Sequence, residues 1–322
     1  DRRTKAVKQI VVPGKRALAF DPGYRVRAEV IPARDNTPLV TYLATPPGRL
    51  CAVNDCPLVV LPHGGPFARD EYPSNATTAW LTNRGYAVLT VNFRGSRGFG
   101  KAFKNLARGQ WGLATQNDIS DAVDWAVKKA KVADPKRIAI VGASFGGDAA
   151  INGITFEPDR YACAVALGAG ANLASFVEKV VATSPELADH LYENVGDVRK
   201  PEVKAALQAR SAFANIAAVK KPILIAHGAQ DMSAPFDDMV AYAEALRARG
   251  AKVAFVVYPD EGHGFNNPQT KVTHYGLIEN FLAGCLGGRP ESVDVSTARQ
   301  KIDIRFGEQD FTFLKNSRVG NE

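Results

Sequence analysis

The sequence predicts an α/β protein in which helices cover both faces of a mainly parallel, doubly wound sheet. Three observations support this prediction. Short apolar runs of strand length recur along the chain, segments with helical spacing separate them, and most of the runs are apolar at every position. A strand that is apolar throughout is buried on both faces, which is typical of a parallel sheet between two helical layers.

The expected strands fall into two groups. Residues 24–30 and 39–43 alternate roughly between apolar and polar side chains, which predicts strands with one face in the core. Pro46, Pro47 and Gly48 then break the chain. The later runs are continuous and predict buried strands at residues 57–62, 86–92, 137–142, 161–167, 222–227 and 253–258.

Helical segments lie between these strands. In residues 117–131, apolar side chains recur at helical spacing, and further helices are expected over residues 78–84, 235–249 and 270–286. Residues 171–216 interrupt the alternation and predict a helical insertion over the sheet.

The chain is expected to form one large domain with an extension at each end. Residues 1–22 show no clear period and predict a linker or arm, and residues 23–288 hold the α/β pattern. Residues 289–322 are polar with some alternating apolar positions, so an arm, an added strand and a disordered tail are all open. Because the chain begins with Asp1 and carries no signal peptide, we expect a processed chain or part of a longer polypeptide.

Composition excludes several classes of protein. Apolar residues make up 46% and charged residues 23% of the 322 residues, close to the globular average. The net charge of +7 is spread over scattered Lys and Arg, so no basic segment of the kind that binds nucleic acid is present. No run of 18 or more apolar residues occurs, so we expect no membrane span.

The four cysteines form no Cys-x-x-Cys pair, which leaves zinc and redox motifs without support. Cys51 and Cys56 flank a probable turn and are expected to be able to form a disulfide. Cys163 and Cys285 lie in apolar stretches and are expected to be small buried hydrophobes. The spacing of the first pair favours a periplasmic or secreted protein over a cytoplasmic one.

A candidate nucleophile follows one of the expected buried strands. Gly142, Ser144 and Gly146 match the pattern Gly-x-Ser-x-Gly, and the residues after them continue as a plausible helix. A serine on such a strand-to-helix turn exposes its hydroxyl at the top of an α/β-hydrolase sheet. The sequence therefore predicts the α/β-hydrolase fold, with Ser144 as nucleophile.

The base that activates this serine is expected to be His263. In α/β-hydrolases the acid and then the histidine follow the serine along the chain, which leaves four candidate histidines. His263 lies just after the last clear strand, where a loop returns over the sheet. His190 falls in the insertion, His274 falls in a helix, and His227 ends a strand and is expected to have a structural part in its loop.

Asp231 is expected to orient the histidine, because it follows the preceding strand directly. Asp237 and Asp238 compete for this part, but they follow Pro235 and suit the first turn of a helix. Asp260 is a further alternative.

Acyl transfer also needs donors for the oxyanion. The backbone N–H of Phe145 comes directly after the nucleophile, and the glycines after His63 follow an early strand. We expect Gly65 and Phe145 to form the oxyanion hole, with Gly64 as the alternative to Gly65.

Together, these motifs resemble the catalytic domain of the prolyl oligopeptidase family, most closely its acylaminoacyl-peptidase and dipeptidyl-peptidase-like branch. The resemblance covers about residues 24–287. The segments that carry it are residues 61–68 (LPHGGPFA), 91–100 (VNFRGSRGFG), 111–112 (WG), 117–118 (ND), 134–138 (DPKRI), 142–147 (GASFGG), 227–231 (HGAQD) and 260–265 (DEGHGF).

The resemblance implies the same triad and the same oxyanion donors, with no cofactor or metal. Members usually carry an N-terminal β-propeller that gates the site, and this chain has no room for one, so residues 1–22 would be the joint to it. Many members have Tyr where Phe93 and Phe145 stand, an aromatic residue in place of Asp148, and Val in place of Ala234. A polar contact to substrate is therefore in doubt at the two phenylalanines, and Asp148 is expected to alter a subsite or bind solvent.

The substrate contacts are left open. Phe93 and Arg94 are candidates for the substrate-binding region, and Arg94 and Arg97 either hold a substrate carbonyl or terminus or form surface ion pairs. The expected substrate is a short peptide or a small ester. A homo-oligomer, or association with a separate propeller-containing chain, is also expected to be possible.

Three functions remain as alternatives. The first is a serine peptidase that cleaves short peptides through an acyl-enzyme, by aminoacyl, acylaminoacyl or dipeptidyl cleavage. The second is a carboxylesterase that uses the same triad. The third is a non-catalytic binding or assembly domain on a hydrolase scaffold.

Overall fold

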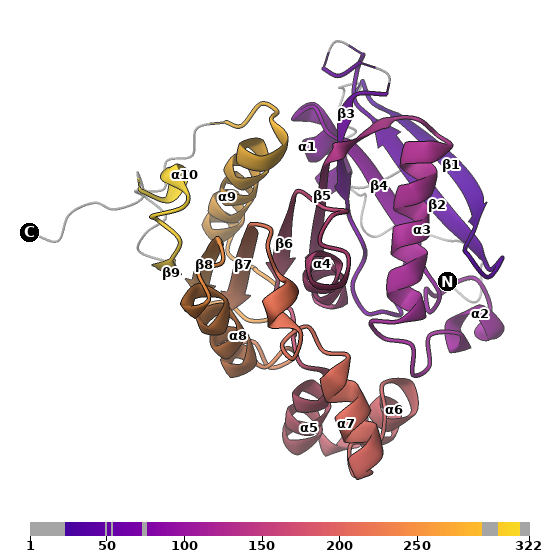
Figure 1. Cartoon of the computed structure of the whole chain (residues 1–322), viewed down its shortest axis with the longest axis vertical. Coiled ribbons are helices and arrows are strands. Elements are labelled where there is room, and N and C mark those ends of the chain that lie inside the picture. Colours follow the sequence, from indigo (N-terminus) through magenta and orange to yellow (C-terminus); the bar gives the residue numbers. More distant parts are fainter. Residues whose placement is uncertain (1–22, 49, 53, 73–75, 292–301, 316–322) are drawn as a thin grey trace, which may run out of the picture.

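Within the described residues, a nine-stranded sheet forms the centre of the structure (Figure 1). The structure is a computed structural model that describes residues 23–48, 50–52, 54–72, 76–291 and 302–315. The expected linker at residues 1–22 lies outside this range. The strand order across the sheet is β1-β2-β4-β3-β5-β6-β7-β8-β9.

The strands from β3 to β8 are parallel to one another, while β1, β2 and β9 add antiparallel pairs at the two edges. This confirms the predicted mainly parallel sheet. The strands are β1 (Arg25–Pro32), β2 (Pro38–Thr45), β3 (Cys56–Val60), β4 (Ala87–Asn92), β5 (Ala133–Ala143), β6 (Cys163–Leu167), β7 (Ile223–Gly228), β8 (Val253–Tyr258) and β9 (Asp303–Phe306).

The helices also follow the expected alternation, although α2 and α10 lie in segments where the sequence predicted none. The helices are α1 (Ala76–Asn83), α2 (Lys101–Asn105), α3 (Ala114–Lys128), α4 (Phe145–Phe156), α5 (Leu173–Thr183), α6 (Ala188–Asn194), α7 (Pro201–Ala209), α8 (Phe236–Ala248), α9 (Pro268–Leu286) and α10 (Thr312–Lys315). Two short 3₁₀ helices are η1 (Pro185–Leu187) and η2 (Ile216–Ala218).

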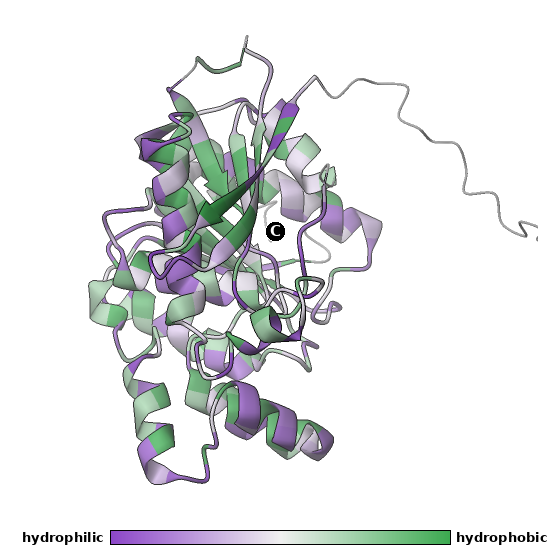
Figure 2. Ribbon diagram, turned by 90° about the vertical axis from the view of Figure 1, so that its right-hand side faces the viewer, coloured by the Kyte–Doolittle hydropathy of each residue, from purple (hydrophilic) through white to green (hydrophobic). Residues whose placement is uncertain are grey.

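The two faces of the sheet bury two separate apolar cores. Leu58 and Val60 of β3 pack into the core under α3, α4 and α8, whereas Val59 between them packs into the core under α1 and α9. Successive side chains of a strand point to opposite faces, so both faces need apolar residues. This is why the strands are apolar throughout, as Figure 2 shows for the green strands inside the molecule.

The predicted insertion forms the helices α5, α6 and α7, which extend beyond the sheet in both views (Figures 1 and 2). The first of them begins with a side-chain cap, because Asn172 accepts a hydrogen bond from the N–H of Ser175 at 3.2 Å. Because α5 follows the carboxyl end of β6, the insertion lies at the edge of the sheet where the parallel strands end.

Part of the C-terminal segment lies within the described residues. In that part, β9 pairs antiparallel with β8 and extends the sheet by one strand. Phe306 of β9 contacts Phe255 of β8 with ring centroids 5.7 Å apart, which buries an apolar side chain at this edge.

The cysteine prediction was right for one pair and incomplete for the other. Cys51 and Cys56 form the expected disulfide. Cys163 and Cys285 were expected to be free hydrophobes, but they form a second disulfide between β6 and α9. The two Cα atoms lie 6.4 Å apart because α9 packs on the face of the sheet to which Cys163 points. Burial of Cys163 was predicted correctly, and its pairing was not.

Candidate active site

The nucleophile candidate sits on a sharp turn between β5 and α4. Ser144 has φ 55° and ψ −128°, a strained conformation for a residue with a side chain. A Cβ atom at Gly142 would clash with the backbone of Gly146, and one at Gly146 would clash with the carbonyl of Pro62. The glycines are therefore required by backbone contact, as expected for a strand-to-helix turn that exposes a serine.

Three predicted residues come together at the carboxyl edge of the sheet. Ser144 follows β5, Asp231 follows β7 and His263 follows β8. The carboxyl ends of parallel strands lie at one edge of the sheet. His263 therefore lies beside Ser144, which is 119 positions earlier in the sequence, and beside Asp231, which is 32 positions earlier. Nε2 of His263 lies 2.9 Å from Oγ of Ser144, and Nδ1 of His263 lies 2.8 Å from Oδ2 of Asp231.

The carboxylate of Asp231 is buried and held by backbone groups. Its Oδ1 accepts hydrogen bonds from the N–H groups of Ser233 and Ala234, both at 2.8 Å. Burial opposes its ionisation, but hydrogen bonds from His227 and His263 outweigh this effect and hold the pKa of Asp231 below its ordinary value. The site therefore contains a fixed negative charge behind the imidazole.

The imidazole of His263 is partly exposed, with 33% of its side-chain surface accessible. The hydrogen bond to Asp231 raises the pKa of His263, and burial only partly opposes this. Because a carboxylate can only accept, Nδ1 of His263 carries the proton that bonds Asp231. Nε2 then has a free lone pair directed at the hydroxyl of Ser144.

Backbone N–H groups lie beside the serine. Phe145 is the first residue of α4, where N–H groups have no partner inside the helix. A Cβ atom at Gly64 would lie 3.4 Å from Cβ of Ser144, so the loop after β3 passes directly by the nucleophile. Gly65 has φ 119°, which only glycine adopts easily, and it precedes a cis bond to Pro66.

The side chain of His63 fixes this loop. Burial lowers the pKa of His63 to about 4, so the ring is neutral near pH 7. Its Nδ1 lies 2.9 Å from the carbonyl oxygen of Gly64, and its Nε2 lies 2.7 Å from Oγ of Ser96, whose hydroxyl donates to the carbonyl of Phe93. In a trans peptide the C=O and the next N–H point in opposite directions. The N–H of Gly65 therefore points away from His63.

Phe93 and Arg94, the candidate substrate contacts, are both buried. Phe93 has no exposed surface and stacks against His63 and Phe145, so it supports the loop and the elbow from inside. The guanidinium of Arg94 donates to both carboxylate oxygens of Asp118, at 2.8 and 2.7 Å. The structure thus gives Arg94 the ion-pair role that the sequence left open, and it does not support either residue as a substrate contact.

Sequence reasoning gave His227 only a structural part, and the structure places it against Asp231. His227 has no exposed surface, and its Nε2 lies 3.3 Å from Oδ2 of Asp231 and 3.2 Å from the carbonyl of Ala234. His227 lies at the end of β7, and Asp231 follows four residues later in a loop where the chain turns back. This spacing is the signal in the sequence that could have revealed the contact.

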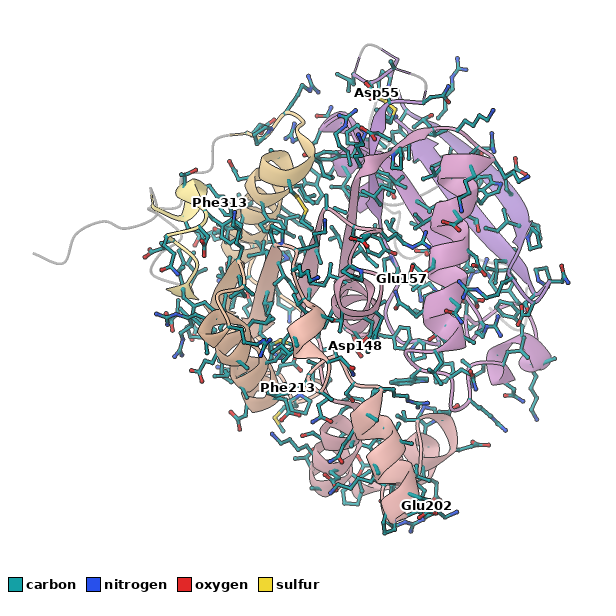
Figure 3. All side chains as sticks on the ribbon, in the orientation of Figure 1. Asp55, Asp148, Glu157, Glu202, Phe213 and Phe313 are labelled. Atoms are coloured by element: carbon teal, nitrogen blue, oxygen red, sulfur yellow. A yellow bond between two sulfur atoms is a disulfide. The ribbon has the colours of Figure 1, made fainter. Side chains whose placement is uncertain are left out.

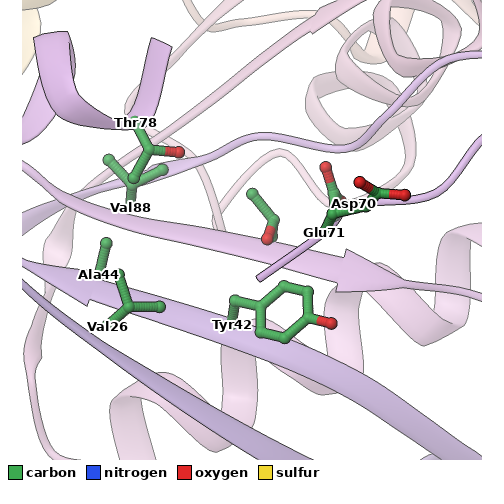
Figure 4. Close-up of a pocket in the computed structure, with 8 residues that line it drawn as sticks. Val26, Tyr42, Ala44, Asp70, Glu71, Thr78 and Val88 are labelled. Carbon is green, nitrogen blue, oxygen red and sulfur yellow. The ribbon is translucent and has the colours of Figure 1, made fainter. Parts of the chain in front are cut away.

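Two cavities differ in their relation to these residues. A cavity of about 390 Å³ lies between α5 and the loop of Asp231, and Met232 and Phe236 help to line it. A second cavity of about 10 Å³, room for about one water, lies over β1, β2 and β4 and contains Asp70 (Figure 4). Only the larger one borders the triad candidates.

Two further findings concern the described part of the chain. Its helices include none that is both long and apolar enough to cross a bilayer. It also contains no cluster of three or more His, Cys, Asp or Glu side chains suited to a metal ion.

The chain is similar in sequence to known peptidases. It is 41% identical over 297 residues to dipeptidyl aminopeptidase BIII of Pseudoxanthomonas mexicana, a match that covers 90% of this chain and 43% of that protein. It is 38% identical over 298 residues to dipeptidyl peptidase family member 6 of Caenorhabditis elegans, covering 84% of this chain and 40% of that protein. The chain thus spans less than half the length of these relatives.

Solved structures share the fold. A puromycin-hydrolyzing peptidase of Mycobacterium tuberculosis matches with a TM-score of 0.76 and 29% identity, over 84% of this chain and 40% of that chain. An acylaminoacyl peptidase of Pyrococcus horikoshii matches with a TM-score of 0.74 over 85% of this chain and 44% of that chain, and at 21% identity it shows the fold alone. The architecture is therefore the α/β-hydrolase fold.

The sequence profile of the prolyl oligopeptidase family matches residues 72–289, which is more than half of the chain. This range contains the turn of Ser144 and the loops of Asp231 and His263. The chain therefore belongs to the prolyl oligopeptidase family.

Proposed function

We propose that this chain is the catalytic part of a serine peptidase that hydrolyses short peptides through an acyl-enzyme on Ser144. The observation that carries the proposal is the continuous hydrogen-bond chain from Ser144 through His263 to Asp231, with distances of 2.9 and 2.8 Å. A nucleophile, a base and an orienting carboxylate in this order form the arrangement that activates a serine hydroxyl.

The geometry supports the following steps. Nε2 of His263 takes the proton of Ser144 while Oγ attacks the substrate carbonyl carbon, and the carbonyl oxygen becomes an oxyanion. His263 then gives the proton to the leaving amine, which breaks the peptide bond and leaves an acyl-enzyme. Water then attacks the acyl-enzyme with His263 as base, and the carboxylic acid product leaves Ser144 free. Asp231 stays ionised throughout and stabilises the imidazolium.

We propose that the N–H groups of Gly65 and Phe145 bind the oxyanion. Phe145 offers a free helix N-terminal donor beside the nucleophile. The hydrogen bond between His63 and the carbonyl of Gly64 turns the N–H of Gly65 away from His63, which supports Gly65 over Gly64 as the second donor.

Relatives bear the names dipeptidyl aminopeptidase, acylamino-acid-releasing enzyme and puromycin-hydrolyzing peptidase. We therefore propose aminoacyl, acylaminoacyl or dipeptidyl cleavage for this chain. The three types differ in what is attached to the nitrogen of the residue that donates the acyl group. This nitrogen is a free amine in aminoacyl cleavage, carries a blocking group in acylaminoacyl cleavage, and is bonded to one further residue in dipeptidyl cleavage.

The test is hydrolysis of a matched panel by wild-type protein and the Ser144→Ala variant. The panel contains aminoacyl, N-acetyl-aminoacyl and dipeptidyl p-nitroanilides together with p-nitrophenyl butyrate. Turnover of an anilide that disappears in Ser144→Ala supports the peptidase, and the preferred blocking group identifies its type. Turnover of the ester alone would contradict the proposal and favour a carboxylesterase.

A fluorophosphonate probe gives an independent measurement. It should label the wild-type protein and not Ser144→Ala, because it reacts with activated serines. If folded wild-type protein were not labelled, a non-catalytic domain would be the better account.

A further inference from the structure

The carboxylate of Asp148 stands one helical turn from the nucleophile candidate. Asp148 lies in the first turn of α4, and its N–H donates to the carbonyl of Ser144 at 3.0 Å. One turn of an α-helix rises about 5.4 Å, so this carboxylate is a close neighbour of the reacting atoms. Figure 3 labels it between α4 and the helices α5 to α7.

This carboxylate has a hydrogen bond but no cation. Oδ1 accepts from the N–H of Gly170 at 2.7 Å. Among residues 23–48, 50–52, 54–72, 76–291 and 302–315, no Lys, Arg or His nitrogen forms an ion pair with Asp148. Two buried carboxylates do have such partners, namely Asp118 with Arg94 and Glu279 with Arg84. Asp70 likewise forms no ion pair among the described residues, but it lies over β1, β2 and β4. Asp148 differs from it in lying one helical turn from Ser144.

The surroundings make the missing cation costly. Burial raises the pKa of Asp148 to about 7, although the hydrogen bond from Gly170 and the nearby His263 favour the charged form. The residue nevertheless keeps some access to solvent. A partly desolvated carboxylate without a cation is unfavourable in its charged form, so it binds either a proton or a cationic ligand. Such groups concentrate at functional sites.

The loop after β6 connects this carboxylate with the triad candidates. A Cβ atom at Gly168 would lie 3.2 Å from Oδ2 of Asp231 and 3.5 Å from Nδ1 of His263, while one at Gly170 would lie 3.8 Å from Oδ1 of Asp148. Residues 168–171 are Gly, Ala, Gly and Ala. The loop between the triad and Asp148 thus contains no side chain larger than a methyl group.

The position of Asp148 relates it to one residue of the substrate. In the proposed reaction the acyl carbon sits at Oγ of Ser144 and its oxygen at the N–H of Phe145, so the residue that donates the acyl group lies over the first turn of α4. Its side chain branches one atom from the reacting carbonyl. Lys and Arg have long apolar stems that carry a charge beyond such a loop of small residues.

We propose that Asp148 is a specificity-determining residue that binds the cationic side chain of a Lys or Arg residue on the acyl side of the cleaved bond. The inference rests on the proposed peptidase function and deepens it. A neutral aromatic or aliphatic residue in the same position would leave the carboxylate unpaired. Selectivity for charge arises because a Lys or Arg side chain forms an ion pair with Asp148, whereas a neutral side chain leaves Asp148 without an ion pair.

The test compares substrates that differ in charge and little in shape. For the full-length enzyme, kcat/KM is measured for anilides with Lys or norleucine, and with Arg or citrulline, at the residue that donates the acyl group. The blocking group is the one that the enzyme prefers. We expect the cationic member of each pair to be favoured by about tenfold to a hundredfold, as for a hydrogen-bonded ion pair. Ratios are used because Asp148 is near His263, so its replacement also alters absolute rates.

Variants assign the effect to this carboxylate. In Asp148→Asn the Lys-to-norleucine ratio should fall to about one, and in Asp148→Glu, which keeps the charge, the preference should persist. Asp260→Asn removes an exposed carboxylate three residues before His263 and should keep the wild-type ratio, which controls for general electrostatic effects.

Three outcomes would overturn the inference. The first is equal turnover of Lys and norleucine substrates by a wild-type enzyme that the fluorophosphonate probe labels, and this would leave the proposed function intact. The second is a preference that survives in Asp148→Asn. The third is a preference for a free terminal amine instead of the side chain, seen as loss of turnover on N-acetylation with no effect of side-chain charge. Absence of both labelling and turnover would instead overturn the proposed function, and this inference with it.

Discussion

Nε2 of His227 lies 3.3 Å from Oδ2 of Asp231, the same carboxylate oxygen that His263 contacts at 2.8 Å. The two groups that face Nε2 of His227, this carboxylate and the carbonyl of Ala234, can only accept hydrogen bonds. Nε2 of His227 must therefore carry a proton. Two imidazoles share one acceptor, and the buried one helps to fix the carboxylate that orients the exposed one.

Replacing His227 should consequently change the proton affinity of His263. His227→Phe removes a donor from Asp231 at similar volume, so the carboxylate should attract the proton on His263 more strongly. The pKa of His263 should rise, and the acid limb of kcat/KM against pH should move upward by about half a unit to one unit. The pH profile measures this shift.

His227→Gln is the matched control for that change. The glutamine amide can replace the Nε2 donor, so the profile should return toward that of the wild type. If both variants lower thermal stability and neither moves the acid limb, His227 is only a packing residue.

Replacing Asp231 should have a far larger effect on rate. In Asp231→Asn the amide can donate to Nδ1 of His263, which would place the proton on Nε2 and remove the base from Ser144. We expect kcat to fall about ten-thousandfold, the size found when an orienting aspartate is replaced in a serine protease. Asp237→Asn, at an exposed position of α8, should stay close to wild type. A loss below tenfold in Asp231→Asn would argue against its orienting role.

The pH profile of the wild type also follows from the site. His263 must be deprotonated at Nε2 to act as base, and its hydrogen bond to Asp231 raises its pKa above the ordinary value. Activity should therefore fall as pH drops, with a midpoint above about 6.5. The same limb should appear with anilide and ester substrates, because both need the base. A midpoint below 6.5 would contradict the assignment.

The sequence predicted features that are encoded locally. Ser144 lies in a turn with a local Gly-x-Ser-x-Gly pattern, and the contact of Gly142 with Gly146 lies within that turn. The apolar strands indicate burial on both faces directly. Order along the chain was enough to expect Asp231 and His263 beside this serine. Features that depend on two distant segments were harder to predict. The ion pair of Arg94 with Asp118 requires knowing which loop meets α3, and the contact of His227 with Asp231 requires the shape of one loop.

The disulfide between Cys163 and Cys285 is another feature of this kind, and it predicts a difference in stability. It closes a loop of 122 residues, whereas Cys51 and Cys56 are only 5 residues apart. In the chain-entropy account, the longer loop restricts the unfolded chain more, and a loop of this size contributes about 5 kcal/mol. The double variant Cys163→Ala/Cys285→Ala should therefore lose more stability than Cys51→Ala/Cys56→Ala. Denaturant unfolding measures both, and equal losses would contradict the expected order.

Arg94 and Arg97 differ in burial, so their replacement should affect stability differently. Arg94 is 7% exposed and donates to Asp118, which has no exposed surface, while Arg97 is exposed. Arg94→Ala leaves a buried carboxylate unpaired and should reduce the free energy of unfolding by about 3–5 kcal/mol. Arg97→Ala should change it by less than about 0.5 kcal/mol, as is usual for surface sites.

The kinetic constants of the two variants distinguish the alternatives that the sequence left open. If Arg97 holds a substrate carbonyl or terminus, Arg97→Ala should raise KM without a loss of stability. If it does not, KM should stay at the wild-type value. For Arg94→Ala, measured below its lowered unfolding temperature, an ion-pair role predicts a KM close to wild type. If Arg94→Ala raised KM strongly and left the free energy of unfolding at the wild-type value, Arg94 would contact substrate and would not stabilise the fold.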